Sequence, residues 1–283
     1  MPLALSTSEQ FLAGFHDANP GVTPRVFAGL PATMAGRTYP SCYDCLASVV
    51  PAGAAPTAVV DVACGDGFLL SLLAARKQVG LSLAGVDISS GELDAARRRL
   101  GAAAVLHQAR AQALPLPDAC ADAVLCHMAL MLMDDAPRVL AEVRRILGPQ
   151  GIFCAVVGGG AAASPAHEVF VSLLRRYRKL PEFESLRLGD RRLNTPEGIA
   201  ELFQPSLGRP VVADIVLQWR LGPAGLWDWF AGMYDLAWLN PADREEIGQR
   251  CARELAPLCD ADGTVQHMVR LRRITVSGDR PCI

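Results

Sequence analysis

The sequence predicts an α/β fold built on a parallel sheet, and two successive strand–turn–helix units carry this prediction. Residues Ala58 to Val62 are mostly apolar and rich in valine, which is typical of a strand buried on both faces. The small-residue turn Ala63 to Gly67 follows, and leucines at helical spacing then indicate a helix over Phe68 to Lys77. The same order repeats with a strand over Leu81 to Val86 and a helix over Gly91 to Leu100.

The turn between the first strand and its helix is suited to holding a ligand. Gly65 and Gly67 lack a Cβ, so a ligand could lie against their backbone, beside N–H groups left unpaired at the start of the helix. A dinucleotide site would require a third glycine where Leu70 stands. Two other interpretations stay open. The residues also fit the pattern acid-x-small-x-Gly-x-Gly, with Asp61 as the acid, and they fit a turn that has only a structural role.

Composition narrows the class of protein. The chain has 283 residues, of which 51% are hydrophobic and 20% charged, so it can bury a sizeable core in one large domain or two small ones. A net charge of −2 argues against a nucleic-acid partner. The N-terminus lacks the pattern of a secretory signal, and no apolar run is long enough for a membrane helix. Nine scattered cysteines favour a reduced, cytoplasmic chain.

The alternation of strands and helices continues to the end of the chain. The turn Ala109 to Asp118 precedes a strand over Ala121 to Cys126, which runs directly into His127. A helix that starts at Asp134 to Pro137 and continues to Leu147 ends in a turn with Gly148, Pro149 and Gly151. Further strands are predicted over residues 103–107, 152–157, 211–218 and 265–276.

Residues 58–157 together resemble the class I S-adenosylmethionine (SAM)-dependent methyltransferases, in particular the small-molecule branch described as methyltransferase type 11. The turn led by Asp61 is similar to the family's first motif. Residues 121–126 are similar to the family's strand segment F-D-x-V-x-x, and residues 139–151 to its helix and turn L-x-E-x-x-R-x-L-K-P-G-G. The resemblance implies a Rossmann-like, doubly wound sheet of seven strands with the last strand antiparallel. It also implies SAM as the cofactor and S-adenosylhomocysteine as the product. The sequence shows no cluster of metal ligands, so we expect no metal.

A set of cofactor contacts follows from these motifs. In the family, the glycine turn passes the methionine part of SAM. Asp87 comes 20 residues after Gly67, at the end of the second strand, where an acid can accept both ribose hydroxyls; the alternative for Asp87 is a helix N-cap. The predicted cofactor-binding residues are Tyr39, Asp61, Ala63, Cys64, Gly65, Gly67, Asp87, Ile88, Ala111, Gln112, Cys126 and His127.

The adenine contact departs from the family pattern. Arg110 stands where the family's segment x-D-A-x-x-L-P-F has aspartate, and an arginine cannot accept a hydrogen bond from the adenine amino group. The backbone N–H of Ala111 and the side chain of Gln112 remain as possible partners.

His127 is the one titratable group that the motifs place near the transferred methyl group. In an open parallel sheet, ligands bind beyond the carboxyl ends of the strands, so Cys126 and His127 should face the ligand. We predict His127 as the catalytic residue, either a general base or an anchor for the substrate. The alternative is that its ring only packs against the cofactor.

The remaining segments are expected to surround this core. Residues 1–50 read as an N-terminal helical extension or cap, in which Arg37, Tyr39 and Tyr43 could meet the ligand, and residues 51–283 as the methyltransferase domain. A lid insertion is expected at about 160–210, with a basic cluster on its helix, and an aromatic helix at 224–239. The predicted substrate-binding residues are Trp227, Phe230 and Tyr234, with an ordinary core stripe as the alternative.

The function predicted from sequence is methyl transfer from SAM to an O, N, S or C atom of a small hydrophobic or aromatic molecule, with specialised metabolites among the candidates. We expect a monomer or homodimer without nucleic-acid or membrane partners. Two alternatives stay open at this point. One is a SAM-binding enzyme that catalyses cyclisation or rearrangement, and the other is an inactive scaffold that binds a partner protein.

Overall fold

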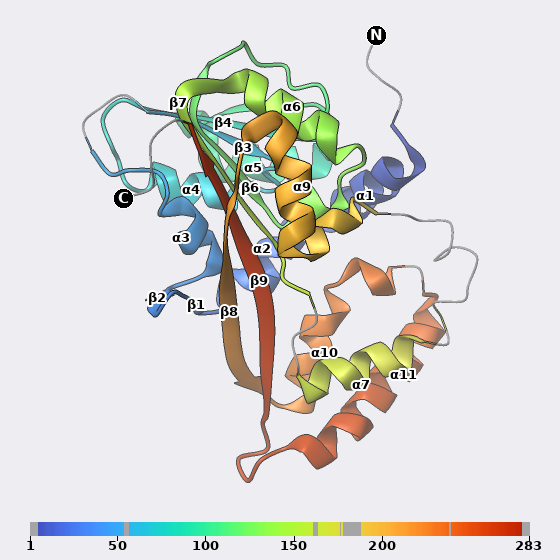
Figure 1. The fold of residues 1–283 in the computed structure, drawn as a ribbon. Helices are drawn as coiled ribbons and strands as arrows, with labels where there is room; N and C mark the ends of the chain where they lie inside the picture. The colour runs from blue at the N-terminus through green and yellow to red at the C-terminus, as the bar shows by residue number, and fades with distance from the viewer. Residues whose placement is uncertain are drawn as a thin grey trace.

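The computed structural model describes residues 5–53, 57–160, 164–175, 177, 188–237 and 239–278. Within this part of the chain, nine strands form one sheet in the order β2-β1-β8-β9-β7-β6-β3-β4-β5 (Figure 1). The strands are β1 (Ala32–Met34), β2 (Arg37–Tyr39), β3 (Thr57–Val62), β4 (Leu81–Asp87), β5 (Val105–Gln108), β6 (Ala121–His127), β7 (Leu147–Gly158), β8 (Val211–Leu221) and β9 (Val265–Ser277).

Seven of these strands form the doubly wound sheet that the sequence predicts. Strands β5, β4, β3, β6 and β7 pair in parallel, and β9, the last strand of the chain, runs antiparallel to both β7 and β8. The strand order reverses at β3, which lies between β4 and β6. Ligands of such sheets bind at this reversal, beyond the carboxyl ends of the strands.

Helices cover both faces of the parallel strands. Side chains of β3 alternate between the faces, so Val59 belongs to one hydrophobic cluster while Val60 and Val62 belong to the other. The first cluster includes residues of α3 (Cys42–Ala47), α4 (Phe68–Ala74) and α5 (Ser90–Leu100). The second includes residues of α6 (Ala136–Ile146) and α9 (Pro196–Leu207).

The N-terminal extension is not wholly helical, which corrects one expectation. After α1 (Thr7–Ala18) and α2 (Val22–Phe27), the chain forms a hairpin of β1 and β2 around Ala35 and Gly36, both with positive φ. Strand β1 pairs antiparallel with β8 and so extends the sheet from the expected seven strands to nine.

A separate group of helices lies beside the projecting ends of β8 and β9 (Figure 1). Helices α7 (Pro165–Leu174), α10 (Pro223–Ala231) and α11 (Pro241–Leu255) share a third hydrophobic cluster. The region 160–210, predicted to be a lid insertion, is therefore divided between α7 in this group and α9 against the sheet. Arg176, Arg178 and Lys179 of the predicted basic cluster lie outside the described residues, as does Trp238 of the aromatic stripe.

The aromatic stretch is also shorter as a helix than the sequence predicts. Helix α10 ends at Ala231, and a single 3-10 turn over Tyr234–Leu236 follows. None of the helices in the described ranges is both long and apolar enough to cross a bilayer.

Two glycines with nearly the same backbone conformation provide a matched test of packing behind the glycine turn. Gly67 (φ 76°) and Gly36 (φ 78°) both lie in the left-handed region. A Cβ on Gly67 would lie 2.6 Å from Leu100 Cδ1, whereas a Cβ on Gly36 would meet nothing within 4 Å.

We therefore expect Gly36→Ala to lower the free energy of unfolding by about 1 kcal/mol, from backbone strain alone. Gly67→Ala should lower it by roughly a further 1–3 kcal/mol, because the methyl group overpacks the contact with α5. Urea unfolding of both variants measures the difference. Equal losses of unfolding free energy would show that a methyl group on Gly67 fits against α5 at no cost.

Candidate functional site

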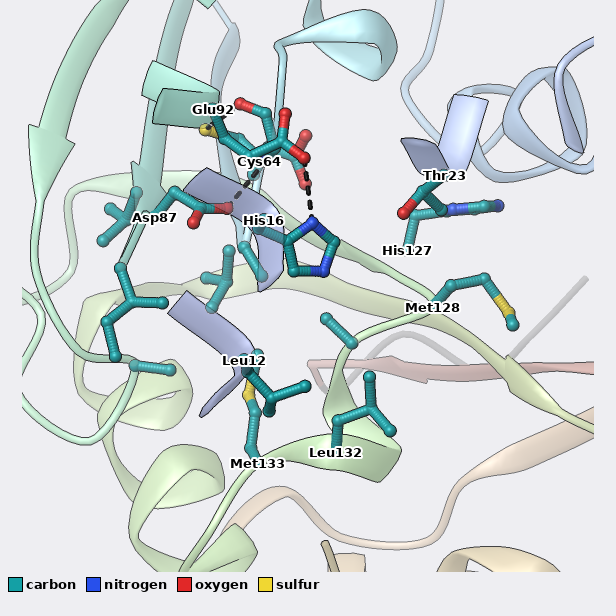
Figure 2. A pocket seen from close by; sticks show the side chains of 18 of the residues that line it. Leu12, His16, Thr23, Cys64, Asp87, Glu92, His127, Met128, Leu132 and Met133 are labelled. Carbon is teal, nitrogen blue, oxygen red and sulfur yellow. Dashed lines mark hydrogen bonds and ion pairs between the residues drawn. The ribbon is translucent and has the colours of Figure 1, made fainter. Parts of the chain in front are cut away.

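A cavity lies at the carboxyl ends of β3, β4 and β6, where the sequence predicts the ligand. Figure 2 shows Asp87, Cys64 and Glu92 on one side of it, Thr23, His127 and Met128 on the other, and the His16 ring between them. Most of the predicted cofactor contacts line this cavity. They are Asp61, Ala63, Cys64, Gly65, Asp87, Ile88, Ala111, Gln112 and His127.

Three predicted contacts lie elsewhere. Tyr39 packs in the first core cluster with the Arg37 guanidinium over its ring, and the neighbouring Tyr43 lines the cavity instead. Gly67 faces α5 rather than the cavity, because a Cβ added to it would clash with Leu100. Cys126 is 1% exposed and belongs to the second core cluster.

The glycine turn is tied to the neighbouring strand by a carboxylate. The backbone N–H of Gly65 donates to Asp87 Oδ2 at 2.8 Å, and the N–H of Ser89 donates to Asp87 Oδ1 at 2.9 Å. Ser89, not Asp87, is the N-cap of α5, because its hydroxyl accepts from the Glu92 N–H. Asp87 therefore shapes the turn while it lines the cavity. Burial raises the pKa of its carboxyl above the ordinary value.

The lining of the cavity is rich in carboxylates. Five carboxyl side chains take part, namely Glu9, Asp61, Asp66, Asp87 and Glu92. Asp61 is 1% exposed, and its Oδ1 has no hydrogen-bond partner in the described part of the chain. Burial, with the nearby charge of Asp87, raises its pKa well above the usual range. A ligand carrying positive charge would relieve both the desolvation and the repulsion between these groups.

Helix α1 covers one side of this cavity and contributes Glu9, Leu12 and His16 to its lining. The Nδ1 atom of His16 lies 2.9 Å from Glu92 Oε1, and the Gly21 N–H donates to Glu92 Oε2 at 2.8 Å. Asp17 Oδ1 accepts from the Ser89 hydroxyl and the Gly91 N–H. The helix is thereby fastened to the start of α5.

The sequence analysis missed these contributions of α1. A local signal was available, because Ser6 and Glu9 form a complete capping box that marks the start of a stable helix. Nothing local, however, indicated which surface that helix would cover.

Arg110, the residue that departs from the family pattern, is bound to α1. Its guanidinium pairs with Glu9 Oε1 at 2.8 Å, and both side chains are largely buried. The Gln112 amide donates to the carbonyl oxygen of Asp134 at 2.6 Å, so this side chain also fixes the surrounding loop. The Arg110 charge therefore holds the N-terminal helix over the cavity.

His127 is a buried, neutral imidazole at the other end of the cavity. Its ring stacks on Tyr43 with centroids 3.6 Å apart, and its Nε2 lies 3.1 Å from Cys42 Sγ. The Nδ1 atom is buried without a hydrogen-bond partner among the described residues. Burial lowers the pKa of His127 to about 3, so the ring is uncharged near neutral pH. One ring nitrogen of His127 therefore has no partner in the part of the chain that the structure describes.

A second cavity adjoins the first. His16, Thr23, Met128 and Leu132 line both. The other walls of the second cavity are mainly apolar and include aromatic and methionine side chains: Phe15, Phe27, Met131, Trp229, Met233, Tyr234 and Met268.

Of the three predicted substrate contacts, only Tyr234 lines the second cavity. Phe230 is fully buried and stacks on Phe170 with centroids 4.4 Å apart. Trp227 packs against α11, where a Cβ on Gly248 would lie 2.8 Å from its ring. Trp229, beside the predicted stripe, lines the cavity instead. No group of three or more His, Cys, Asp or Glu in the described ranges is arranged to hold a metal ion.

Comparison with known proteins places these features in a family. Residues 60–155 match the family model described as Methyltransferase domain. The chain is 31% identical over 232 residues to a trans-aconitate 2-methyltransferase from Methylobacterium nodulans, covering 80% of this chain and 85% of that protein. It is 39% identical over 100 residues to a demethylmenaquinone methyltransferase from Symbiobacterium thermophilum, a match that spans 34% of this chain and 40% of the relative.

Solved structures show the same fold at low sequence identity. The YcgJ protein from Bacillus subtilis superposes with a TM-score of 0.56 at 18% identity, over 84% of this chain and 98% of that one. The [4+2]-cyclase SpnF gives a TM-score of 0.55 at 18% identity, over 98% and 99% of the two chains.

The doubly wound sheet, with a glycine turn and an acid where the strand order reverses, defines a Rossmann-like α/β protein. The comparisons complete the identification. The chain belongs to the class I SAM-dependent methyltransferase family.

The buried state of His127 predicts a pH dependence of stability. Its folded-state pKa of about 3 lies below the value of about 6.5 expected in the unfolded chain. Between these values the unfolded chain binds a proton that the folded chain does not, so stability is lost as pH falls from about 6.5 toward 3.

We therefore expect the unfolding free energy of the wild type to drop between pH 7.5 and pH 5.0 by about 2 kcal/mol more than that of His127→Gln. Urea titrations at the two pH values measure both drops. Parallel behaviour of the two proteins would mean that the imidazole protonates without leaving its buried position.

Proposed function

We propose that this protein transfers the methyl group of SAM to a small hydrophobic or aromatic acceptor. The acidic lining of the cavity at the strand reversal is the observation that carries the proposal. SAM bears a sulfonium and an ammonium group, which complement the carboxylates, whereas the two phosphates of a dinucleotide would add to their repulsion. The glycine turn beside Asp87 offers bare backbone for such a ligand.

Each part of SAM has a partner of suitable chemistry in the lining. We assign the methionine part to the backbone of Ala63 to Gly65 and its ammonium group to the unpartnered Oδ1 of Asp61. A carboxylate has about four lone-pair sites, so Asp87 can accept the ribose hydroxyls beside the two N–H groups it already binds. The adenine would lie between Ile88 and the Ala111–Gln112 segment.

The protein's own contribution is orientation and the exclusion of water. When bound, SAM supplies a methyl group on a sulfonium centre that leaves as S-adenosylhomocysteine. Helix α1 covers the cofactor cavity, and the adjoining second cavity offers apolar walls to an acceptor. Holding two reactants in line can account for about 7–11 kcal/mol of barrier lowering in favourable cases.

We assign His127 the role of anchoring the acceptor. Its unpartnered Nδ1 can form a hydrogen bond with an acceptor hydroxyl or amine, while Nε2 is occupied by Cys42. A pKa of about 3 makes the ring a weak proton acceptor, and a sulfonium nearby would oppose its protonation further. These features favour the anchor over the general base.

The second cavity supports a hydrophobic or aromatic acceptor, and the relatives support a small-molecule acceptor. Aromatic and methionine walls suit a hydrophobic or aromatic body, and specialised metabolites are candidates of this kind. The named activities of two relatives are methyl transfer to trans-aconitate and to demethylmenaquinone, both small molecules.

Calorimetric titration tests the cofactor assignment. We expect the wild type to bind SAM and S-adenosylhomocysteine but not NAD. Asp87→Asn should weaken both sulfur ligands about tenfold or more, because a charged acceptor for the ribose is lost. Asp94→Asn, an exposed acid on α5, serves as the matched control and should bind like the wild type. Binding of NAD, or undiminished affinity in Asp87→Asn, would refute this cofactor geometry.

Methyl transfer from labelled SAM to the best acceptor in a screen of hydroxylated aromatics tests His127. His127→Gln should keep its affinity for S-adenosylhomocysteine within about twofold and lose at least about tenfold in kcat/KM, because one acceptor hydrogen bond is misplaced. His107→Gln, a half-buried histidine on β5, is the control. If the wild-type rate rises with pH around an apparent pKa near 7, and the rate of His127→Gln does not, the ring acts as a base.

A further inference from the structure

Among the described residues that line the second cavity, one carries a permanent charge. Arg270 is the only arginine or lysine among its described lining residues, and no aspartate or glutamate takes part. The lining thus contrasts with that of the first cavity, where five carboxylates gather. Arg110 also lines the first cavity, but its charge is paired with Glu9, so the carboxylates remain in excess there and an anionic group would be attracted more by the second cavity.

Arg270 is placed at the rim of this cavity. It lies on β9 and is exposed, although it lines the cavity. The Gly159 N–H donates to the Arg270 carbonyl at 2.9 Å, and a Cβ on Gly159 would lie only 2.9 Å from Arg270 Cγ. The absence of a side chain at Gly159 therefore leaves room for the arginine stem beside the cavity wall.

The Arg270 guanidinium forms no ion pair and no side-chain hydrogen bond within the described part of the chain. The neighbouring Arg272 donates to the Asn194 carbonyl and lies 3.8 Å from Asp214, and Arg273 donates to the Cys45 carbonyl. None of the ion pairs or side-chain hydrogen bonds between described residues includes Arg270. Arg270 lines an apolar cavity, and its guanidinium offers five donors that pair with no acid among the described residues, so it is suited to a ligand carboxylate.

The connection between the cavities sets the orientation of such a ligand. Thr23 and Met128 line both cavities, whereas Arg270 lines only the second and His127 only the first. A molecule that spans the junction can therefore present one group toward His127 while another group meets Arg270. The apolar walls between these points require an apolar middle section.

We propose that the methyl acceptor is a small organic acid with an apolar body, whose carboxylate pairs with Arg270 and whose nucleophilic group reaches the junction of the cavities. This inference rests on the proposed function and adds the acidic group to it. One guanidinium matches the single charge of a carboxylate, whereas a phosphate group would leave part of its charge unpaired.

Three matched probes test the proposal on the full chain in the presence of S-adenosylhomocysteine. They are 6-hydroxy-2-naphthoate, its methyl ester, and 6-hydroxynaphthalen-2-yl phosphate, which share one ring system and one hydroxyl. Quenching of tryptophan fluorescence measures binding, because Trp229 lines the cavity. Arg270→Gln removes the charge, Arg270→Lys keeps it, and Arg253→Gln on α11 is the control.

We expect the wild type to bind the carboxylate about tenfold more tightly than the ester, as a charge-assisted contact at an exposed rim allows. Arg270→Gln should lose this preference with unchanged affinity for the ester, and Arg270→Lys and Arg253→Gln should retain it. Equal binding of carboxylate and ester by the wild type, binding of neither, or a preference that survives Arg270→Gln overturns the proposal. Tighter binding of the phosphate than of the carboxylate overturns the choice of a carboxylate.

Calorimetry separates this result from a failure of the proposed function. Arg270→Gln should bind S-adenosylhomocysteine as the wild type does, because Arg270 does not line the cofactor cavity. If the wild type itself binds no S-adenosylhomocysteine, the proposed function fails. If it binds that ligand and still does not discriminate acid from ester, only the acidic acceptor is wrong.

Discussion

The hydrogen bond from the Gly65 N–H to the buried Asp87 carboxylate is the contact on which the site depends. Strands β3 and β4 pair in parallel register up to Val62 and Val86, so the turn after one strand ends beside the acid that closes the other. The carboxylate satisfies a backbone donor that a buried turn would otherwise leave unpaired, and in return its own desolvation is partly offset. Because the turn is held in this way, the bare backbone of Gly65 faces the cavity.

The rest of the site follows from the need to accommodate buried negative charge. Glu92 accepts from the Gly21 N–H and contacts His16, so the acidic start of α5 also fixes the segment that covers the cavity. The Oδ1 atom of Asp61 has no hydrogen-bond partner among the described residues, and burial of this carboxyl raises its pKa. The family to which the chain belongs uses a cationic cofactor, which would supply the missing positive charge.

Arg110 shows what a family pattern leaves open at a single position. Sequence reasoning identified Arg110 as a departure that puts the adenine contact in doubt, and the structure adds its partner, Glu9, about a hundred positions earlier in the chain. The tyrosines show the same limit, since Tyr39 packs in the core and Tyr43 stacks on His127 at the cavity. A charge or an aromatic ring has a recognisable chemistry in sequence, but its partner depends on which segments the fold brings together.

The sequence by itself determined the alternating strands and helices and the glycine turn with Asp87, because these depend on local periodicity and on short connections between adjacent elements. The antiparallel last strand followed from the family resemblance. The place of His127 at the cavity followed from the rule that ligands bind beyond the carboxyl ends of parallel strands, whereas those of Asp61, Ile88 and Ala111 followed from the family resemblance. Only the tertiary structure decided that β1 and β2 join the sheet, that α1 covers the first cavity, and that Arg270 lines the apolar second cavity without an ion pair to any described residue. Those features arise from contacts between residues far apart in the chain, which no local pattern encodes.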